Sequence, residues 1–145
     1  MQRRDRVVRC MTAYPPRRGT RRIDPMVSIL IADDDAHIRL LLRTILLRDG
    51  HAVLEANDGI EALRLLREAR PAIAILDVEM PPPSGLDICR GVRADPDLAG
   101  IHLIVVTGSA TEAEAVAAGA DIHLAKPFSP SQLSAAVAGL AAEGP

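Results

Sequence analysis

Acidic side chains stand at the ends of two apolar runs in this sequence. Asp33 and Asp34 follow the run 27–32, and Asp77 follows the run 72–76. Short apolar runs of this kind predict buried parallel strands. The carboxyl ends of parallel strands form the edge at which open α/β sheets place their chemistry. We therefore expect these three carboxylates to meet at one edge of a sheet.

A hydroxyl and an amine extend this predicted site. Thr107 ends a later apolar run, and Lys126 lies near the end of another. Clustered carboxylates repel one another, so they favour a hard cation with oxygen ligands, such as Mg²⁺. A carboxylate can also carry a phosphoryl group as an aspartyl phosphate, while a metal and a lysine neutralise charge on the transferring oxygens. The combination predicts transfer of a phosphoryl group to Asp77.

Composition limits the class of protein. The chain has 145 residues, the usual size of one domain. Its core must be aliphatic because Tyr14 and Phe128 are the only aromatic residues, and so few rings argue against a platform for stacked bases. The two cysteines, Cys10 and Cys89, give no disulfide framework, which predicts a cytoplasmic protein. No apolar stretch reaches the ~20 residues of a membrane-spanning helix.

Charge divides the chain at Pro25. Residues 1–25 carry eight Arg and two Asp, whereas residues 26–145 carry nine basic and seventeen acidic groups. The first segment shows no helical or strand period, which predicts a basic, disordered arm before a domain at 26–145. Two interpretations of the arm stay open: it touches nucleic acid or an anionic membrane, or translation starts at Met26 and the extension is passive.

The domain alternates strand-like and helix-like segments. Strands are predicted at 27–32, 51–55, 72–77, 102–106 and 121–125. Amphipathic segments between and after them predict helices, with Leu41 and Ala69 among the residues facing inward. Five such units predict one parallel sheet with helices on both faces, because each crossover is right-handed.

Several segments of the domain together resemble a known family, the CheY-like receiver domains of two-component response regulators. The matching segments are 29–35 (ILIADDD), 56–63 (ANDGIEAL), 76–81 (LDVEMP), Gly85, Thr107, 118–121 (AGAD) and 126–128 (KPF). The resemblance extends over residues 27–142. It implies a flavodoxin-like α/β fold with a five-stranded parallel sheet of order 2-1-3-4-5.

The resemblance also implies a donor of the phosphoryl group and a set of metal ligands. Asp77 would accept the group from the phosphohistidine of a histidine kinase or of a histidine phosphotransferase. Asp33, Asp34 and Asp77 would hold Mg²⁺, together with the backbone carbonyl of Glu79.

Three further positions would respond to phosphorylation. Thr107 would hydrogen-bond the phosphoryl group and act as a switch, Lys126 would pair with the group, and the Lys126–Pro127 peptide bond would be cis. His123 stands where the family often has a Tyr or Phe coupled to that hydroxyl. The segment between Thr107 and residues 118–121 is shorter than is usual in the family, by about one helical turn, so the family's partner contacts are not carried over.

These expectations describe a stand-alone phosphoacceptor switch rather than an enzyme with a separate substrate, since only residues 143–145 follow the last predicted helix. Output would pass to an unknown protein partner, without direct contact to nucleic acid or membrane, from a monomer or a phosphorylation-dependent dimer. Two alternatives stay open. One is a degenerate receiver that only binds; the other is a Mg²⁺ phosphohydrolase of the haloacid-dehalogenase type, which would want an Asp where Glu79 stands.

Overall fold

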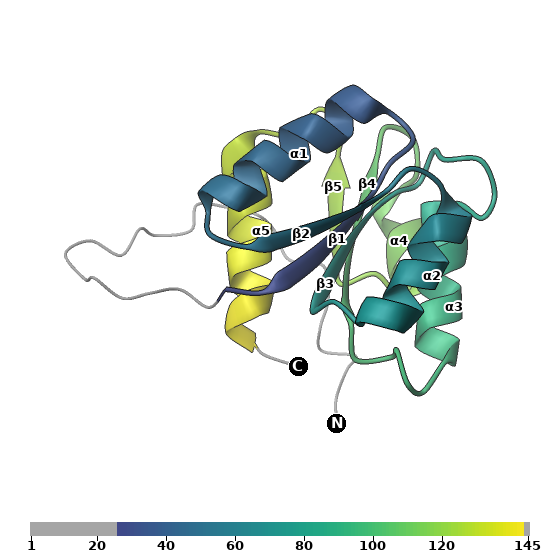
Figure 1. Cartoon of the computed structure of the whole chain (residues 1–145). Coiled ribbons are helices and arrows are strands. Elements are labelled where there is room, and N and C mark those ends of the chain that lie inside the picture. Colours follow the sequence, from purple (N-terminus) through teal and green to yellow (C-terminus); the bar gives the residue numbers. More distant parts are fainter. Residues whose placement is uncertain (1–25, 144–145) are drawn as a thin grey trace.

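A single parallel sheet forms the centre of the computed structural model, which describes residues 26–143 (Figure 1). Its strands are β1 (Ser28–Ala32), β2 (Ala52–Ala56), β3 (Ile73–Asp77), β4 (His102–Thr107) and β5 (Ile122–Ala125). They are parallel and lie in the order β2-β1-β3-β4-β5. The predicted fold class and strand order are therefore confirmed. The basic arm predicted at residues 1–25 lies outside the described residues.

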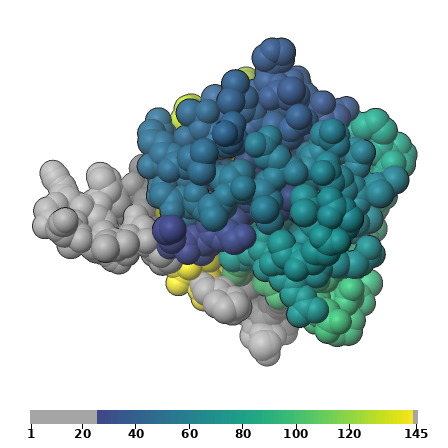
Figure 2. All heavy atoms as spheres, viewed as in Figure 1, coloured from purple at the N-terminus to yellow at the C-terminus, as the bar shows by residue number. Residues whose placement is uncertain are grey.

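Helices cover both faces of the sheet. They are α1 (Ala36–Arg48), α2 (Gly59–Ala69), α3 (Gly85–Ala94), α4 (Glu112–Ala118) and α5 (Pro130–Glu143). Figure 1 shows α1 and α5 on one face and α2, α3 and α4 on the other. In the space-filling view, the segments from β1 to α2 fill most of the visible face (Figure 2). Within residues 26–143 no helix is long and apolar enough to cross a bilayer.

The two core layers follow from the alternation of side chains along each strand. Ile29 and Ile31 of β1 pack in the layer of α1 and α5, whereas Leu30 and Ala32 pack in the layer of α2, α3 and α4. A parallel strand covered on both faces is apolar at nearly every position, which explains why the central strands β1 and β3 read as almost continuous aliphatic runs. Cys89 is buried in the second layer, as expected of a small apolar side chain.

Side chains that follow the strand ends begin the helices. The capping residues are Asp35, Asp58, Ser84, Thr111 and Ser129. Each accepts a hydrogen bond from a backbone N–H of the first helical turn, which satisfies a donor that the helix itself leaves unpaired. The caps thereby fix the loops at the carboxyl edge of the sheet, where the predicted site residues lie.

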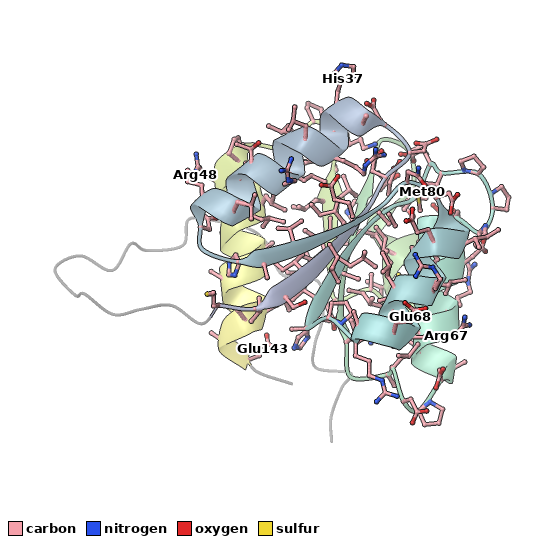
Figure 3. All side chains as sticks on the ribbon, in the orientation of Figure 1. His37, Arg48, Arg67, Glu68, Met80 and Glu143 are labelled. Atoms are coloured by element: carbon pink, nitrogen blue, oxygen red, sulfur yellow. The ribbon has the colours of Figure 1, made fainter. Side chains whose placement is uncertain are left out.

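Two residues predicted to face inward are exposed. Leu41 has 45% of its surface exposed, and Ala69, the last residue of α2, is exposed too. The buried residues of α1 are Leu42, Ile45 and Leu46, and Ile38 packs beside them. Leu41 lies outside this stripe, since successive residues are turned by about 100°. Apolar spacing alone cannot show how wide the buried stripe is. His37, near the start of the same helix, points out into solvent (Figure 3).

Arg93 ties α3 to the far edge of the sheet. Its Nη2 lies 2.8 Å from Asp121 Oδ2, and its Nε donates to the carbonyl of Gly119, which caps the C-terminus of α4, at 2.8 Å. Its Nη1 donates to the carbonyls of Ala99 and Ile101, at 2.8 and 2.7 Å. One guanidinium thus joins the loop before β4 to the turn before β5.

Replacing Arg93 should destabilise the fold. Asp121 is buried. Arg93→Ala removes the guanidinium that pairs with it and that donates to the carbonyls of Ala99, Ile101 and Gly119, so it should lower the free energy of unfolding by about 3 kcal/mol. Arg90→Ala is the control, because Arg90 pairs with Asp87 on the surface and such pairs contribute about 0.5 kcal/mol. Urea unfolding measures both. Equal effects of the two substitutions would contradict this role of Arg93.

Candidate functional site

Three carboxylates meet at the carboxyl edge of the sheet, as the strand pattern predicts. Asp33 and Asp34 follow β1, and Asp77 ends the adjacent strand β3. One carboxylate oxygen from each lies within 4.8 Å of the others. Asp33 and Asp77 are buried, while Asp34 is exposed. The cluster therefore opens to solvent on the side of Asp34.

The backbone beneath Asp77 explains a glycine at position 85. A Cβ atom added to Gly85 would lie 2.7 Å from the carbonyl oxygen of Asp77. Contacts this short do not occur between real Cβ atoms and backbone, so a larger residue would push the end of β3 aside. Gly85 therefore helps to place the Asp77 carboxylate at the sheet edge.

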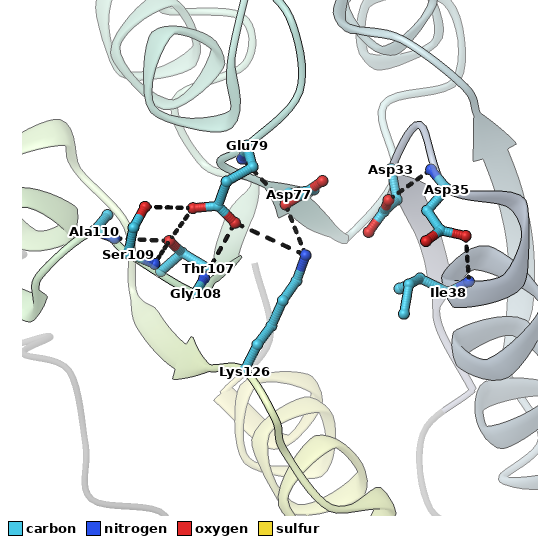
Figure 4. Close-up of polar contacts among 10 residues, drawn as sticks. All are labelled: Asp33, Asp35, Ile38, Asp77, Glu79, Thr107, Gly108, Ser109, Ala110 and Lys126. Carbon is cyan, nitrogen blue, oxygen red and sulfur yellow. Dashed lines mark hydrogen bonds and ion pairs between the residues drawn. The ribbon is translucent and has the colours of Figure 1, made fainter.

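Lys126, which follows β5, reaches the cluster from the other side. Its Nζ donates to Asp77 Oδ1 at 3.1 Å and lies 3.8 Å from Glu79 Oε1 (Figure 4). The backbone N–H of Glu79 donates to the same Asp77 oxygen at 3.1 Å. Within residues 26–143, both hydrogen bonds that Asp77 accepts go to Oδ1, which leaves Oδ2 for a ligand. The Lys126–Pro127 peptide bond is cis.

Burial raises the pKa of one residue at this edge, and neighbouring acidic charges raise the pKa of another. Burial raises the pKa of Asp33 from its ordinary value of 3.8 to about 6; the charges of Asp77 and Asp34 add to this, while the hydrogen bond from Asp35 N and the charge of Lys126 oppose it. Burial alone would lower the pKa of Lys126, but the hydrogen bond and charge of Asp77, with the charges of Asp33 and Glu79, raise it above its usual value. The lysine therefore stays protonated beside the acids.

Glu79 is held in a ring of donors from the loop after β4 (Figure 4). Its Oε2 accepts from Thr107 Oγ1 at 2.6 Å and from Ser109 Oγ at 2.8 Å, and its Oε1 accepts from the Gly108 N–H at 3.1 Å. Burial raises the pKa of Glu79, but these three hydrogen bonds and the charge of Lys126 outweigh it and lower the pKa to about 2. Glu79 is therefore ionised at neutral pH.

The hydroxyl of Thr107 organises the same loop. Thr107 Oγ1 accepts from the N–H groups of Ser109 and Ala110, at 3.0 and 2.8 Å. His123 Nε2 lies 3.1 Å from the carbonyl oxygen of Ala110, and a carbonyl can only accept, so this nitrogen carries the proton. A continuous chain of hydrogen bonds therefore connects Glu79, Thr107, Ala110 and His123, across 44 residues of sequence.

The donor set at Asp33, Asp34 and Asp77 fits a hard divalent cation. One carboxylate oxygen from each of the three residues lies within 4.8 Å of the others. The pKa of Asp33 is raised first by burial and then by the neighbouring carboxylates, and a cation would offset this unfavourable negative charge. Oxygen-only ligands with room for water are the arrangement that Mg²⁺ prefers. The backbone carbonyl of Glu79 was also predicted as a ligand, and it remains a prediction.

Sequence reasoning placed Asp33, Asp34, Asp77 and Lys126 together, and the structure brings them together. It missed Gly108 and Ser109 as donors to Glu79. A serine and a backbone amide in a short loop carry no spacing signal, because their direction depends on the loop conformation. It also assigned Thr107 to the phosphoryl group alone, whereas here that hydroxyl is bonded to Glu79.

The structure thus combines a five-stranded parallel sheet of order β2-β1-β3-β4-β5 with an acidic cluster and a lysine at its carboxyl edge. The sequence profile of the response regulator receiver domain matches residues 29–138. The transcriptional regulatory protein GltR of Pseudomonas aeruginosa is 41% identical over 116 residues, covering 78% of this chain and 48% of GltR. The response regulator MprA of Mycobacterium sp. (strain KMS) is 42% identical over 112 residues, covering 75% of this chain and 48% of MprA.

Solved structures agree with the sequence comparison. The chemotaxis response regulator CheY4 of Vibrio cholerae superposes with a TM-score of 0.74 at 30% identity, covering 79% of this chain and 98% of CheY4. The receiver domain of a signal transduction histidine kinase from Syntrophus aciditrophicus superposes with a TM-score of 0.77 at 30% identity, covering 81% and 92%. The chain belongs to the receiver domain family of two-component response regulators. It spans about half the length of the curated relatives it matches.

The shifted pKa of Asp33 predicts a pH-dependent stability in the absence of divalent metal. Because the folded-state pKa is raised, the proton on Asp33 stabilises the folded protein at low pH, and this contribution is lost as the pH rises through about 6. Asp33→Asn stays neutral, so its free energy of unfolding should fall less than that of the wild type between pH 5 and 7, by about 1 kcal/mol.

Urea unfolding at these two pH values measures the difference. The opposite shift of Glu79 does not interfere, because it acts only below its ordinary pKa of 4.5. Parallel losses of stability in the two proteins would show that Asp33 does not titrate in this range.

Proposed function

We propose that this receiver domain accepts a phosphoryl group on Asp77 and passes the signal to a protein partner. The donor is the phosphohistidine of a histidine kinase or of a histidine phosphotransferase. The observation that carries the proposal is the place of the Asp77 carboxylate, which lies between the acidic pair Asp33 and Asp34 and the ammonium group of Lys126. Receiver domains as a family work with histidine kinases and downstream effectors, which supports the choice of donor.

In the proposed step, a carboxylate oxygen of Asp77 attacks the phosphorus atom. The new O–P bond forms as the P–N bond to the donor histidine breaks, and the electron pair of that bond returns to the imidazole nitrogen. Asp77 Oδ2 is the oxygen that no donor within residues 26–143 occupies, so it is the better nucleophile. Lys126 and the Glu79 N–H hold Oδ1 and thereby orient the carboxylate.

A metal ion is part of the proposal. Mg²⁺ held by Asp33, Asp34 and Asp77, with the backbone carbonyl of Glu79, would supply positive charge next to the oxygens of the transferring group. The exposed side of Asp34 gives the ion access from solvent. Lys126 then pairs with the phosphoryl group from the opposite side of Asp77.

The loop after β4 is the proposed switch. Thr107 Oγ1 is buried at the edge of the site, and the loop is connected through Ala110 to His123 on β5. A phosphoryl group on Asp77 offers strong acceptors to Thr107, and any movement of Thr107 is carried to Ala110 because its N–H is bonded to the threonine hydroxyl. This is how a local charge change reaches the surface.

The two alternative functions fit less well. A phosphohydrolase of the haloacid-dehalogenase type needs a carboxylic acid two residues after the nucleophile that can give up a proton, whereas Glu79 has a pKa of about 2 and is bonded to the loop. A binding-only receiver would not need the acids, Thr107 and Lys126 together. We therefore propose a switch whose only chemistry is on itself.

The partner, the cellular location and the oligomeric state of the domain are part of the proposed function. The matched region covers 48% of GltR and 48% of MprA, so these relatives are longer than this chain. For the output of the domain we therefore propose only contact with a protein partner. A cytoplasmic location is proposed from the cysteine content. Oligomeric state, whether monomer or phosphorylation-dependent dimer, is part of what phosphorylation would be expected to control.

Phosphorylation of Asp77 is directly testable. After incubation with acetyl phosphate and Mg²⁺, the intact mass of the wild type should rise by about 80 Da, the mass of one phosphoryl group bound as an acyl phosphate. Asp77→Asn should show no adduct, because an amide is not a nucleophile for this group. Asp97→Asn, in an exposed loop, is the control and should be labelled like the wild type. An adduct on Asp77→Asn would sink the assignment.

Metal binding has its own test. Mg²⁺ at ten times its dissociation constant should raise the free energy of unfolding by about 1.4 kcal/mol. Asp34→Asn should remove most of this gain, because it deletes a charged ligand of the cluster. Asp35→Asn is the matched control: Asp35 lies outside the cluster and caps α1, and asparagine caps equally well. Equal stabilisation by Mg²⁺ in both variants would refute the proposed ligand set.

A further inference from the structure

Glu79 occupies the donors that a phosphoryl group on Asp77 would need. On the β4 side of Asp77, the polar hydrogens come from Thr107 Oγ1, the Gly108 N–H and Ser109 Oγ, and all three are bonded to the Glu79 carboxylate. Lys126 Nζ is shared, lying 3.1 Å from Asp77 Oδ1 and 3.8 Å from Glu79 Oε1. One carboxylate therefore fills an anion site beside the acceptor.

We infer that Glu79 is an internal anion that competes with the phosphoryl group for the Thr107 loop and so sets how readily Asp77 is phosphorylated. The inference rests on the proposed function of Asp77. It assigns Glu79 as a positioning residue: its carboxylate makes no bond to Asp77 and acts through Thr107, Ser109 and Lys126.

The geometry explains why the two anions exclude each other. A hydroxyl has a single hydrogen to donate, so Thr107 Oγ1 cannot serve Glu79 and a phosphoryl oxygen together. The same holds for Ser109 Oγ. Phosphorylation then exchanges one anion for another on the same donors, and Glu79 must swing out towards solvent. Its side chain is already 38% exposed, so a path outward exists.

The competition has a consequence for the resting loop. Two N–H groups bonded to Thr107 Oγ1 and the hydroxyl's own bond to Glu79 hold this residue in place before any phosphoryl group arrives. The loop is therefore already ordered around a carboxylate in the resting protein. Phosphorylation must break the hydrogen bonds of Glu79, and this free-energy cost opposes it. The Glu79 side chain that leaves the loop then changes the surface of the protein.

The probe for the competition is beryllofluoride, a stable analogue of the phosphoryl group that binds an aspartate carboxylate. Its affinity is measured by calorimetry with saturating Mg²⁺. Glu79→Gln removes the charge and should bind the analogue about tenfold more tightly than the wild type, the equivalent of one charge-assisted hydrogen bond no longer opposed. The backbone carbonyl of residue 79 is retained in this variant.

Two further variants separate competition for hydrogen bonds from simple charge repulsion. Glu79→Asp keeps the charge but is one methylene shorter, so it cannot reach both Thr107 and Ser109 and should also bind more tightly than the wild type. Glu68→Gln is the charge-matched control on α2. Glu68 lies on the surface (Figure 3) and pairs with Arg64, so this variant should bind like the wild type.

Each outcome decides the matter. Tighter binding by both Glu79 variants supports competition. Unchanged or weaker binding by Glu79→Gln overturns it, and so does tighter binding by Glu79→Gln with wild-type binding by Glu79→Asp, which would leave only long-range repulsion. If acetyl phosphate labels Asp77 but the affinities are equal, the inference alone fails. If neither the wild type nor any of the variants binds the analogue or takes a phosphoryl group, the proposed function fails and the inference fails with it.

Discussion

Repulsion among the carboxylates of Asp33, Asp34 and Asp77 is the constraint on which the rest of the site depends. Three acids within 4.8 Å of one another are unfavourable without nearby positive charge. Lys126 supplies part of it, and a proton on Asp33 or the proposed divalent cation would supply the rest. In the proposed function, the cation that offsets this repulsion would also offset the negative charge of the transferring phosphoryl oxygens. The carboxylates that the proposed function needs are thus the groups whose repulsion destabilises the folded protein.

The fold meets this constraint with geometry rather than with flexible loops. Adjacent parallel strands β1 and β3 end at the same edge, which brings the acids together, and β5 delivers Lys126 from the far side of β4. Two aliphatic layers fix the strands from both faces, and capped helices fix the loops. The ion pair of Arg93 with Asp121 anchors β5 at its start. Hydrogen bonds hold Glu79 and the loop after Thr107 against each other.

Much of this was predictable because the sequence carries it in period and position. Apolar runs predict buried strands, and the residues that follow them predict the acidic edge. Alternation of strands and helices predicts a parallel sheet with helices on both faces, whereas the order of its strands came from the family resemblance. Leu41 and Ala69 were predicted wrongly because spacing gives the centre of a helix face but not its width. The ring of donors around Glu79 could not be foreseen at all. It depends on where two side chains 28 residues apart point, as with Thr107 and Glu79, and no local pattern encodes that.

The most direct test of the account is to locate the phosphoryl group on the chain. After phosphorylation with acetyl phosphate and Mg²⁺, borohydride reduces an acyl phosphate of aspartate to homoserine, and peptide sequencing by mass spectrometry finds the altered residue. The account predicts homoserine at position 77 and unmodified acids at Asp33, Asp34 and Glu79. Reduction at any of these three in place of Asp77 would contradict it, because the nucleophile would then lie outside the position held by Lys126.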